Sequence, residues 1–134
     1  MSRAAKEIVS EYYRTALAGE FDAMKALLDP NIRVVEAGSL PYGGVWEGMD
    51  AFMTLMAKVF EIWKDCRVEV KQLIAEGEWV VAMSEMSGAG AVSGIPFKMP
   101  LAEVYRVLNG RIVEITPYYL DAKVLSDIHH SNPS

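Results

Sequence analysis

Glu103 is the side chain in this sequence best suited to proton-transfer chemistry. It lies in the segment FKMPLAEVYRV, whose alternation of residue types is typical of a β-strand with one apolar face. A carboxylate buried on that face would lose its hydration, so it must be paired, hydrogen-bonded or protonated. The alternative is an edge strand whose inner face is wet at this position. The residues predicted to share the face with Glu103 are Phe97, Met99, Leu101, Tyr105 and Val107.

Other catalytic chemistries lack the residues that they need. His129 and His130 stand near the C-terminal end, so neither a serine nor Cys66 has a nearby base that could make it a nucleophile. The sequence contains no paired-Cys or His-x-x-x-His motif, no P-loop and no dinucleotide-binding glycine fingerprint. We therefore expect no metal and no cofactor. If the protein is an enzyme, its carboxylates carry the reaction.

The composition is typical of one compact domain. The chain has 134 residues, of which 51% are hydrophobic and 23% charged. The 13 Lys and Arg residues and 18 Asp and Glu residues give a formal net charge of -5 without a basic cluster, which argues against a nucleic-acid partner. No segment has the apolar length of a signal peptide or a membrane span, so we expect no membrane association. The single cysteine, interpreted as a passive thiol, agrees with a cytoplasmic location.

The first half of the chain has helical periodicity. Apolar residues recur every three or four positions from Ala5 to Ala16, and Ala18-Gly19 breaks the run. A second helix is predicted from near Glu20 to Asp29-Pro30, followed by a short strand, IRVVEA, and a loop, GSLPYGGVWEG. A third helix is predicted to begin close to Gly48, with a broad apolar stripe that packs on a sheet.

The second half has the alternating pattern of β-strands. Four strands are predicted, at CRVEVKQLIAEG, EWVVAMSEMSGAGAV, IPFKMPLAEVYRVL and RIVEITPYYL, and Asn109-Gly110 is a tight-hairpin signal between the last two. Helices followed by an antiparallel meander indicate an α+β fold with the helices on one face of one sheet. Residues 1–134 are expected to form a single domain, with 129–134 as a frayed tail.

The order of these elements, with several local strings, resembles the SnoaL-like, nuclear transport factor 2-like superfamily. The strings are YYRTALAGEFDAMKALLDPNIRVVE, GVWEGMDAF and LNGRIVEITPYYLDAKVL, and together they extend over nearly the whole chain. The superfamily includes ketosteroid isomerases, polyketide cyclases and small dehydratases. The resemblance implies a curved antiparallel sheet wrapped around the N-terminal helices as a cone, with an apolar cavity open at one end. It also implies a protein that is often dimeric.

The resemblance to the ketosteroid isomerase subgroup implies three catalytic positions. Tyr12 corresponds to a tyrosine on the first helix, Glu36 to the general base at the end of the first strand, and Glu103, in EVYR, to a second acid on a later strand. Both acids are Glu where the isomerases have Asp, so each carboxylate reaches one methylene further, and steroid isomerisation is not implied. In that subgroup the two carboxyl groups lie in environments that separate their pKa values.

General acid-base chemistry is consistent with these three residues. Glu36 would remove a proton next to a carbonyl, while neutral Glu103 and the Tyr12 hydroxyl would donate to the oxygen that becomes negative. The same set would serve double-bond migration, aldol cyclisation or dehydration. Two alternatives stay open, namely that Glu36 is a solvated strand end, and that Tyr13 rather than Tyr12 faces the pocket.

Further residues are candidates for the pocket wall because the resembling fold is hollow, although such aromatic and methionine residues are more often plain core. Glu85 would be a third acid on the concave face, in alternation with Trp79, Val81 and Met83, or else an exposed residue. Asp121 would either line the pocket or cap a short helix over AKVLSDI. The wall candidates are Trp46, Met56, Phe60, Trp63, Met83, Glu85, Met99, Tyr118 and Asp121.

The leading functional hypothesis is a cofactor-independent enzyme that acts on an apolar carbonyl compound, of the isomerase, cyclase or dehydratase type. Its rivals are a non-catalytic protein that binds an apolar metabolite and a dimeric interaction domain, since one fold hosts many functions. A limonene-type epoxide hydrolase needs an Asp-Arg-Asp arrangement, but Arg106 alternates to the face opposite Glu103. We expect a homodimer that buries the outer sheet face, near Val80, Ala82, Val104 and Lys98.

Overall fold

The computed structural model describes residues 4–132 and has an α+β fold. Within that range the chain forms four helices and six strands, which make one mixed sheet. The expectation for the last residues of the tail, 133–134, lies outside the described part. The elements are α1 (Ala5–Leu17), α2 (Phe21–Ala26), β1 (Leu28–Glu36), β2 (Gly44–Glu47), α3 (Met49–Ile62), β3 (Trp63–Glu76), β4 (Trp79–Gly90), β5 (Pro96–Leu108), β6 (Arg111–Tyr119) and α4 (Ala122–His130).

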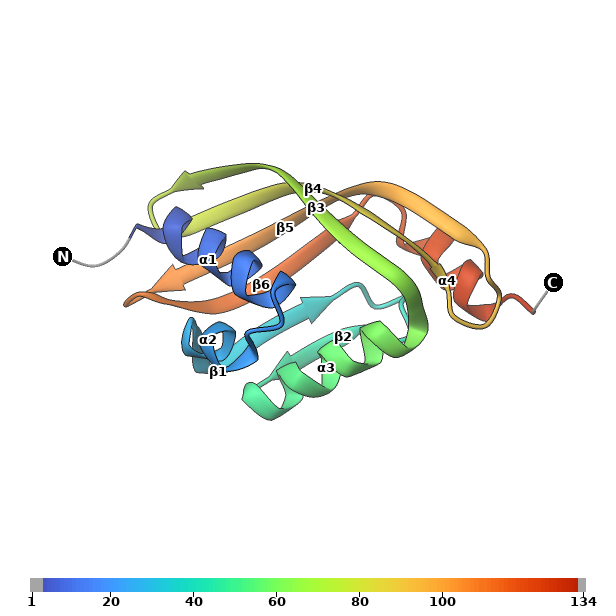
Figure 1. The fold of residues 1–134 in the computed structure, drawn as a ribbon, viewed down its shortest axis with the longest axis horizontal. Helices are drawn as coiled ribbons and strands as arrows, with labels where there is room; N and C mark the ends of the chain where they lie inside the picture. The colour runs from blue at the N-terminus through green and yellow to red at the C-terminus, as the bar shows by residue number, and fades with distance from the viewer. Residues whose placement is uncertain (1–3, 133–134) are drawn as a thin grey trace.

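The sheet has the strand order β2-β1-β6-β5-β4-β3 and is not closed into a barrel. Strands β3 to β6 form the predicted antiparallel meander. β1, however, runs parallel to β6, so the sheet is mixed rather than purely antiparallel. Parallel strands need a long crossover connection, and here the whole chain between β1 and β6 supplies it. The first strand is thereby placed beside the last one (Figure 1).

The elements around β1 and β2 differ from the sequence prediction. Asp29 and Pro30 belong to β1 rather than to the end of a helix, because Leu28 already pairs with Ile112 of β6. The segment predicted as a loop contains the short strand β2, in which Val45 pairs with Val35 of β1. Short edge strands such as β2 carry little periodic signal of their own, because tertiary pairing decides their conformation.

The helices α1 and α3 lie on one side of the curved sheet (Figure 1). Helix α1 contacts β3, β4, β5 and β6, and its buried residues include Ile8, Val9 and Tyr12. Helix α3 contacts β1, β2 and β3 and buries Phe52 and Leu55. At one end of the sheet, α4 continues through His129 and His130, and the His129 ring lies 6.3 Å from that of Trp63.

The inner face of β4 is the one opposite to that predicted. Val80 and Ala82, expected on the outer face, have no exposed surface, and they pair with Tyr105 and Glu103 on the inner face of β5. Met83, expected inside, is 45% exposed. β4 carries apolar residues on both faces, so alternation alone cannot assign the inner one.

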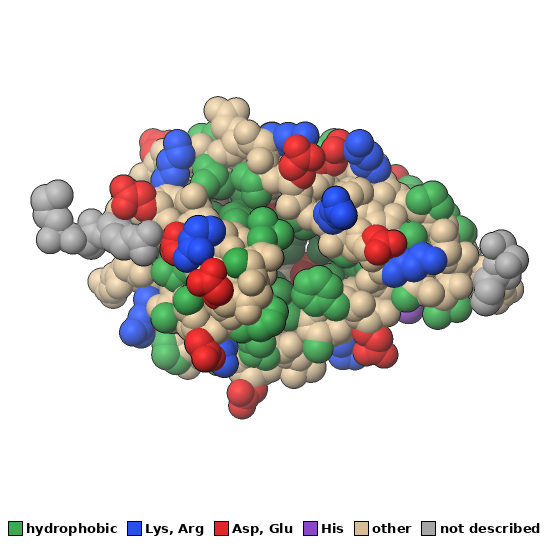
Figure 2. Space-filling view, viewed as in Figure 1, with side chains coloured by type: hydrophobic (Ala, Val, Ile, Leu, Met, Phe, Trp, Pro, Cys, Tyr) green, Lys and Arg blue, Asp and Glu red, His purple; other side chains and the backbone are tan. Residues whose placement is uncertain are grey.

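The side of the sheet that carries the helices is hollowed. Figure 2 shows a depression near the middle of this side, with hydrophobic side chains around it and acidic atoms at its floor. In the part of the chain that the structure describes, no helix is long and apolar enough to cross a membrane.

Candidate active site

Glu103 lies on the inner face of β5 and accepts a hydrogen bond from helix α1. The Tyr13 hydroxyl donates to its Oε1 atom at 2.7 Å, and the Tyr105 hydroxyl donates to that of Tyr13 at 2.6 Å. Tyr105 is two residues beyond Glu103 on the strand, so both side chains point inward. The three groups form a directed chain from Tyr105 through Tyr13 to the carboxyl group.

Burial sets the protonation of this chain. Desolvation raises the pKa of Glu103, and the hydrogen bond from Tyr13 opposes part of that rise. Desolvation and the nearby carboxyl group of Glu103 also raise the pKa of Tyr13 and that of Tyr105. The hydroxyl groups therefore keep their protons, and Glu103 holds a proton to a higher pH than an exposed glutamate does.

Glu36 is the last residue of β1 and is 8% exposed. The alternation Ile32, Val34, Glu36 places it on the inner face of the strand. Its Oε1 atom accepts a hydrogen bond of 2.8 Å from the Tyr119 hydroxyl. Desolvation raises the pKa of Glu36 to about 7, against the hydrogen bond from Tyr119, which lowers it, and with the charge of Glu103, which raises it further. The alternative of a solvated strand end does not fit this burial.

A second layer of aromatic residues lies behind Glu36. Tyr42, in the loop after β1, and Trp63, at the start of β3, are each 1% exposed. The indole nitrogen of Trp63 donates to the Tyr42 hydroxyl at 3.0 Å, and the hydroxyls of Tyr42 and Tyr119 also interact. Desolvation raises the pKa of Tyr42 to about 12, so this hydroxyl stays protonated at neutral pH.

The two carboxyl groups lie close enough to interact, because the charge of Glu103 raises the pKa of Glu36. Among residues 4–132, no Lys, Arg or His side chain forms an ion pair with either of them. Arg106 points to the other face of β5, where it bonds Glu78 at 2.7 Å. The site therefore contains two acids and several hydroxyl donors, without the arginine that an Asp-Arg-Asp hydrolase requires.

Cys66 lies in an irregular stretch of β3, where the pairing with β4 shifts between Lys64 and Arg67. Its thiol is partly buried against the core. Desolvation, followed by the charge of Glu103, raises its pKa to about 11. The thiol is thus close enough to Glu103 to sense its carboxylate and is protonated at neutral pH.

Tyr12 occupies a different place from the one expected of a catalytic residue. Its ring is 7% exposed and packs edge-on against those of Tyr13 and Tyr105, at centroid distances of 5.6 and 5.8 Å. The tyrosine of α1 that donates to Glu103 is its neighbour, Tyr13. Successive helical residues are about 100° apart around the axis, so only one of an adjacent pair can point at a given group.

The other predicted wall residues divide between the interior and the surface. Trp63 and Met99 are buried, and Trp46 and Met56 pack partly buried against the core. The exposed side chains are Phe60, Met83 and Tyr118. Glu85 also lies on the outer face of β4, where it pairs with Lys98 at 3.5 Å.

Asp121 is a helix cap rather than a wall residue. Its carboxylate accepts a hydrogen bond of 3.2 Å from the backbone N–H of Val124, at the start of α4. This is the second of the two roles that the sequence allowed for it. Capping satisfies a backbone donor that the first turn of a helix otherwise leaves without a partner.

Three residues of the site were not predicted to have a functional role: Tyr105, Tyr119 and Tyr42. Tyr13 was the open alternative to Tyr12. Tyr105 carried a usable signal, because it alternates with Glu103, whereas the prediction that Tyr118 faces the pocket would turn its neighbour Tyr119 outward. Tyr42 lies in a loop and reaches the site only through tertiary packing. No group of three or more possible metal ligands occurs among the described residues.

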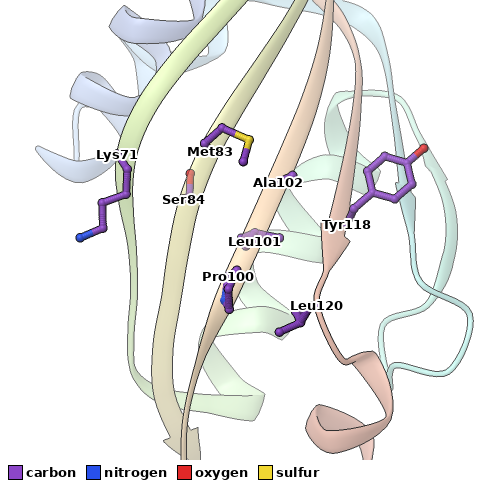
Figure 3. A pocket seen from close by; sticks show the side chains of 8 residues that line it. All are labelled: Lys71, Met83, Ser84, Pro100, Leu101, Ala102, Tyr118 and Leu120. Atoms are coloured by element: carbon purple, nitrogen blue, oxygen red, sulfur yellow. The ribbon is translucent and has the colours of Figure 1, made fainter.

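A separate groove crosses the outer face of the sheet (Figure 3). Its volume is about 410 Å³, and it contains none of the acids described above. Met83 of β4 extends toward β5, and Tyr118 of β6 lines the groove from the other side of β5. The residues that line it are Lys71, Met83, Ser84, Pro100, Leu101, Ala102, Tyr118 and Leu120.

Solved structures of similar fold support the architecture. An NTF2-like protein from Burkholderia thailandensis is 23% identical, with 96% of this chain and 99% of that chain covered and a TM-score of 0.87. A candidate SnoaL-like polyketide cyclase from Jannaschia sp. CCS1 is 18% identical, with 98% and 99% covered and a TM-score of 0.79. A protein with a ketosteroid isomerase-like fold from Catenulispora acidiphila, solved in complex with trimethylamine, is 18% identical, with 84% and 85% covered and a TM-score of 0.71.

At these identities the solved structures establish the fold alone. No curated protein matches the sequence. The family comparison is more direct, because the model of the SnoaL-like domain matches residues 9–115, which include most of the helical layer and both buried carboxyl groups. The chain belongs to the SnoaL-like domain family.

Proposed function

We propose that this protein is a cofactor-independent enzyme that moves a proton on an apolar carbonyl compound, with Glu36 as base and Glu103 as acid. The observation that carries the proposal is a pair of inward-facing carboxyl groups, Glu36 buried and Glu103 partly buried, each held by a tyrosine hydroxyl and without a cationic partner among the described residues. Two acids with different surroundings can hold different protonation states at one pH. The fold belongs to a family that includes polyketide cyclases and isomerases.

Glu36 has the properties of a general base at neutral pH. A pKa of about 7 leaves a large fraction of the group ionised near pH 7, yet makes it a stronger base than an exposed carboxylate. Its Oε1 atom is held by Tyr119, so Oε2 is the oxygen that would take the proton from the substrate. The C–H electron pair would then move toward the carbonyl, whose oxygen becomes negative.

Glu103 would stabilise that oxygen as a neutral donor. Its Oε1 atom accepts from Tyr13, so its own proton lies on Oε2 and can be donated to the developing oxyanion. Tyr105 and Tyr13 then act in series behind Glu103, because each hydroxyl polarises the next. The proton returned to another carbon would complete an isomerisation, while attack of the enolate carbon on a second carbonyl would complete a cyclisation.

A second candidate function is binding of an organic amine without turnover. Two buried carboxyl groups without a basic partner favour a ligand that brings a positive charge, and tyrosine and tryptophan rings favour alkylammonium groups. The ketosteroid isomerase-like neighbour from Catenulispora acidiphila was solved with trimethylamine. A carbonyl enzyme and an amine binder differ in the protonation that they require, because the amine needs the carboxyl groups ionised. Binding of an uncharged apolar metabolite is the third possibility.

The first experiment needs no substrate. We expect an NMR titration of the glutamate side-chain carboxyl carbons to give Glu36 a pKa near 7, with Glu36→Gln and Glu103→Gln used for assignment. If both residues titrate at the ordinary glutamate value of 4.5, the proton-transfer proposal fails. Trimethylamine added to the same sample tests the amine alternative, because a bound cation lowers the pKa of the carboxyl groups that it contacts.

Turnover can be tested with 5-nitrobenzisoxazole, a small apolar reagent that reports a carboxylate base in a dry site. Removal of its C3 proton forms the nitrile and breaks the N–O bond, which releases a coloured phenolate. We expect Glu36→Gln to lower kcat/KM by at least about 100-fold, in the range of general-base effects. Glu85→Gln, on the outer face, is the matched control and should leave kcat/KM unchanged.

A further inference from the structure

Tyr119 ends β6 at the point where that strand passes beside β1. Inward residues of β6 alternate as Ile115, Pro117 and Tyr119, while Tyr118 between the last two is 61% exposed. The hydroxyl of Tyr119 reaches the Oε1 atom of Glu36 at 2.8 Å. Within residues 4–132 this is the one hydrogen bond to the Glu36 side chain, and it comes from a strand that pairs directly with β1.

The Tyr119 hydroxyl is itself fixed from behind. It interacts with the hydroxyl of Tyr42, which accepts a hydrogen bond from the buried indole of Trp63 at 3.0 Å. The Trp63 ring packs edge-on against Phe97 and Tyr42, at centroid distances of 5.1 and 6.5 Å. A side chain held at both ends has little rotational freedom to lose when the substrate binds.

We propose that Tyr119 is a positioning residue for Glu36, whose hydroxyl holds Oε1 and so assigns Oε2 to the substrate proton. The proposal rests on the role of Glu36 as base given above. A glutamate side chain has three rotatable bonds, and without a fixed partner its carboxylate would sample several orientations in a hollow. Productive proton transfer requires the oxygen and the C–H group to be held near 3 Å, so the anchored orientation contributes directly to the rate.

Several titratable groups surround Glu36 and share its electrostatic environment. Tyr119 faces it from β6, Tyr42 from the loop after β1, and Glu103 from β5. Tyr13 of α1 and Cys66 of β3 interact with Glu103. Of these groups, Tyr119 is the one whose contact favours the ionised form of Glu36. Its removal must therefore raise the pKa of Glu36, because desolvation then acts without opposition.

The test is Tyr119→Phe, which removes one oxygen atom from the site. We expect the pKa of Glu36, measured by carboxyl-carbon NMR, to rise by about one pH unit, the size of one hydrogen bond to a charged group. The lower limb of the kcat/KM profile for 5-nitrobenzisoxazole should move up by the same amount. At a pH above the pKa of Glu36 in both the parent protein and the variant, kcat should fall about 10-fold with little change in KM.

Tyr118→Phe is the matched control, since it removes the hydroxyl of the neighbouring, outward residue, and it should change none of these quantities. A Tyr119→Phe protein that folds and leaves the pKa of Glu36 unchanged overturns the proposal. If Tyr119→Phe does not fold, 3-fluorotyrosine placed at position 119 is the second variant. Its more acidic hydroxyl is a stronger donor and should lower the pKa of Glu36, whereas an unchanged or raised value overturns the proposal.

Failure of the proposed function and failure of the Tyr119 role alone give different results. If Glu36→Gln keeps full turnover while Tyr119→Phe raises the pKa of Glu36, the hydrogen bond exists but Glu36 is not the base. The proposed function and the positioning role then fall together. If Glu36→Gln abolishes turnover and Tyr119→Phe changes neither pKa nor kcat, the base stands and only the positioning role is overturned.

Discussion

The hydroxyl groups of Tyr105 and Tyr13 donate in one direction, toward the carboxyl group of Glu103. Each donor in such a chain strengthens the next, so the effect of Tyr105 on the reaction passes through Tyr13. Tyr12 contributes to the same region by ring packing, and its ring lies edge-on to both of the others. Adjacent tyrosines on α1 therefore have separable roles, one polar and one in packing.

Substitution of the two tyrosines separates these roles. Tyr13→Phe removes the hydrogen bond that lowers the pKa of Glu103, so we expect that pKa to rise further and kcat for 5-nitrobenzisoxazole to fall by about 10-fold or more. Tyr12→Phe should leave both quantities within about twofold of the parent protein. Carboxyl-carbon NMR and steady-state kinetics measure the two effects. An equal loss in both variants would contradict the assignment of the hydrogen bond to Tyr13.

Glu36 should also make the stability of the protein depend on pH. Its pKa is about 7 in the folded protein and near the ordinary 4.5 in the unfolded chain, so the folded state binds the proton more tightly. The free energy of unfolding should therefore fall as pH rises from about 4.5 to 7, by at most about 3 kcal/mol from this group. Glu103, whose pKa is also raised, contributes in the same direction.

Urea denaturation of Glu36→Gln measures this contribution. The variant has no titrating group at position 36, so it should gain stability relative to the parent protein between pH 4.5 and pH 7. Glu85→Gln, with its carboxylate paired to Lys98 on the outer face, is the control and should keep the parent slope. A parent protein whose stability rises with pH over this window would contradict the raised pKa of Glu36.

The sequence predicts the inward placement of Glu103 because a single strand pattern contains all the information that is needed. Alternation within β5 decides the face, and the structure confirms that decision. The sequence cannot decide between Tyr12 and Tyr13. The two are neighbours on α1, and which of them faces Glu103 depends on where β5 lies. Tyr42 has no local signal at all, since a loop residue is placed by the strands on either side of it.

At the scale of the elements, β4 shows how alternation can mislead. Val80 and Ala82 face the core, while Trp79 and Met83 face outward, so both faces of the strand are apolar. The decisive information is the register with β5, which pairs Ala82 with Glu103. Register is a property of two strands and cannot be read from one. The order of the helices and of strands β3 to β6 follows from periodicity and turns, and it agrees with the prediction.

The first turn of α4 depends on Asp121. Asp121→Ala removes the acceptor for the Val124 N–H, so we expect a loss of about 1 kcal/mol in the free energy of unfolding, without a change in the pKa of Glu36. Asp127→Ala is the control, because it removes only an exposed pair with Lys123 and should cost less than about 0.5 kcal/mol. Chemical denaturation measures both. If Asp121→Ala lowers kcat/KM for 5-nitrobenzisoxazole without lowering the free energy of unfolding, Asp121 is a pocket residue instead of a helix cap.

At the scale of the whole molecule, the outer sheet face carries the exposed apolar side chains of Trp79, Met83 and Tyr118. The groove lined by Met83 and Tyr118 lies there (Figure 3), and the same face carries the ion pair of Glu85 with Lys98. Contiguous exposed apolar patches commonly mark interaction sites. We expect a second copy of this chain to cover the face, with Val104 and Lys98 near the contact. Val80 and Ala82, first assigned to it, are in the core.

A single charge on this face tests the dimer. We expect the parent protein to sediment as a dimer at micromolar concentration in analytical ultracentrifugation, and Met83→Glu to sediment as a monomer because the interface would bury an unpaired carboxylate. Phe60→Glu, which adds the same charge at an exposed position of α3, should remain dimeric. A monomeric parent protein at that concentration would remove the proposed interface.

The single thiol of the chain gives this site a built-in reporter. Cys66 lies close to Glu103, and its pKa of about 11 keeps it almost entirely protonated at pH 8. The thiolate displaces iodide from iodoacetamide, so each chain should gain one carbamidomethyl group, slowly, and a compound that fills the hollow should make the reaction slower still. Intact-mass spectrometry of a compound library would then rank ligands by the protection they give, before any reaction of the protein is known.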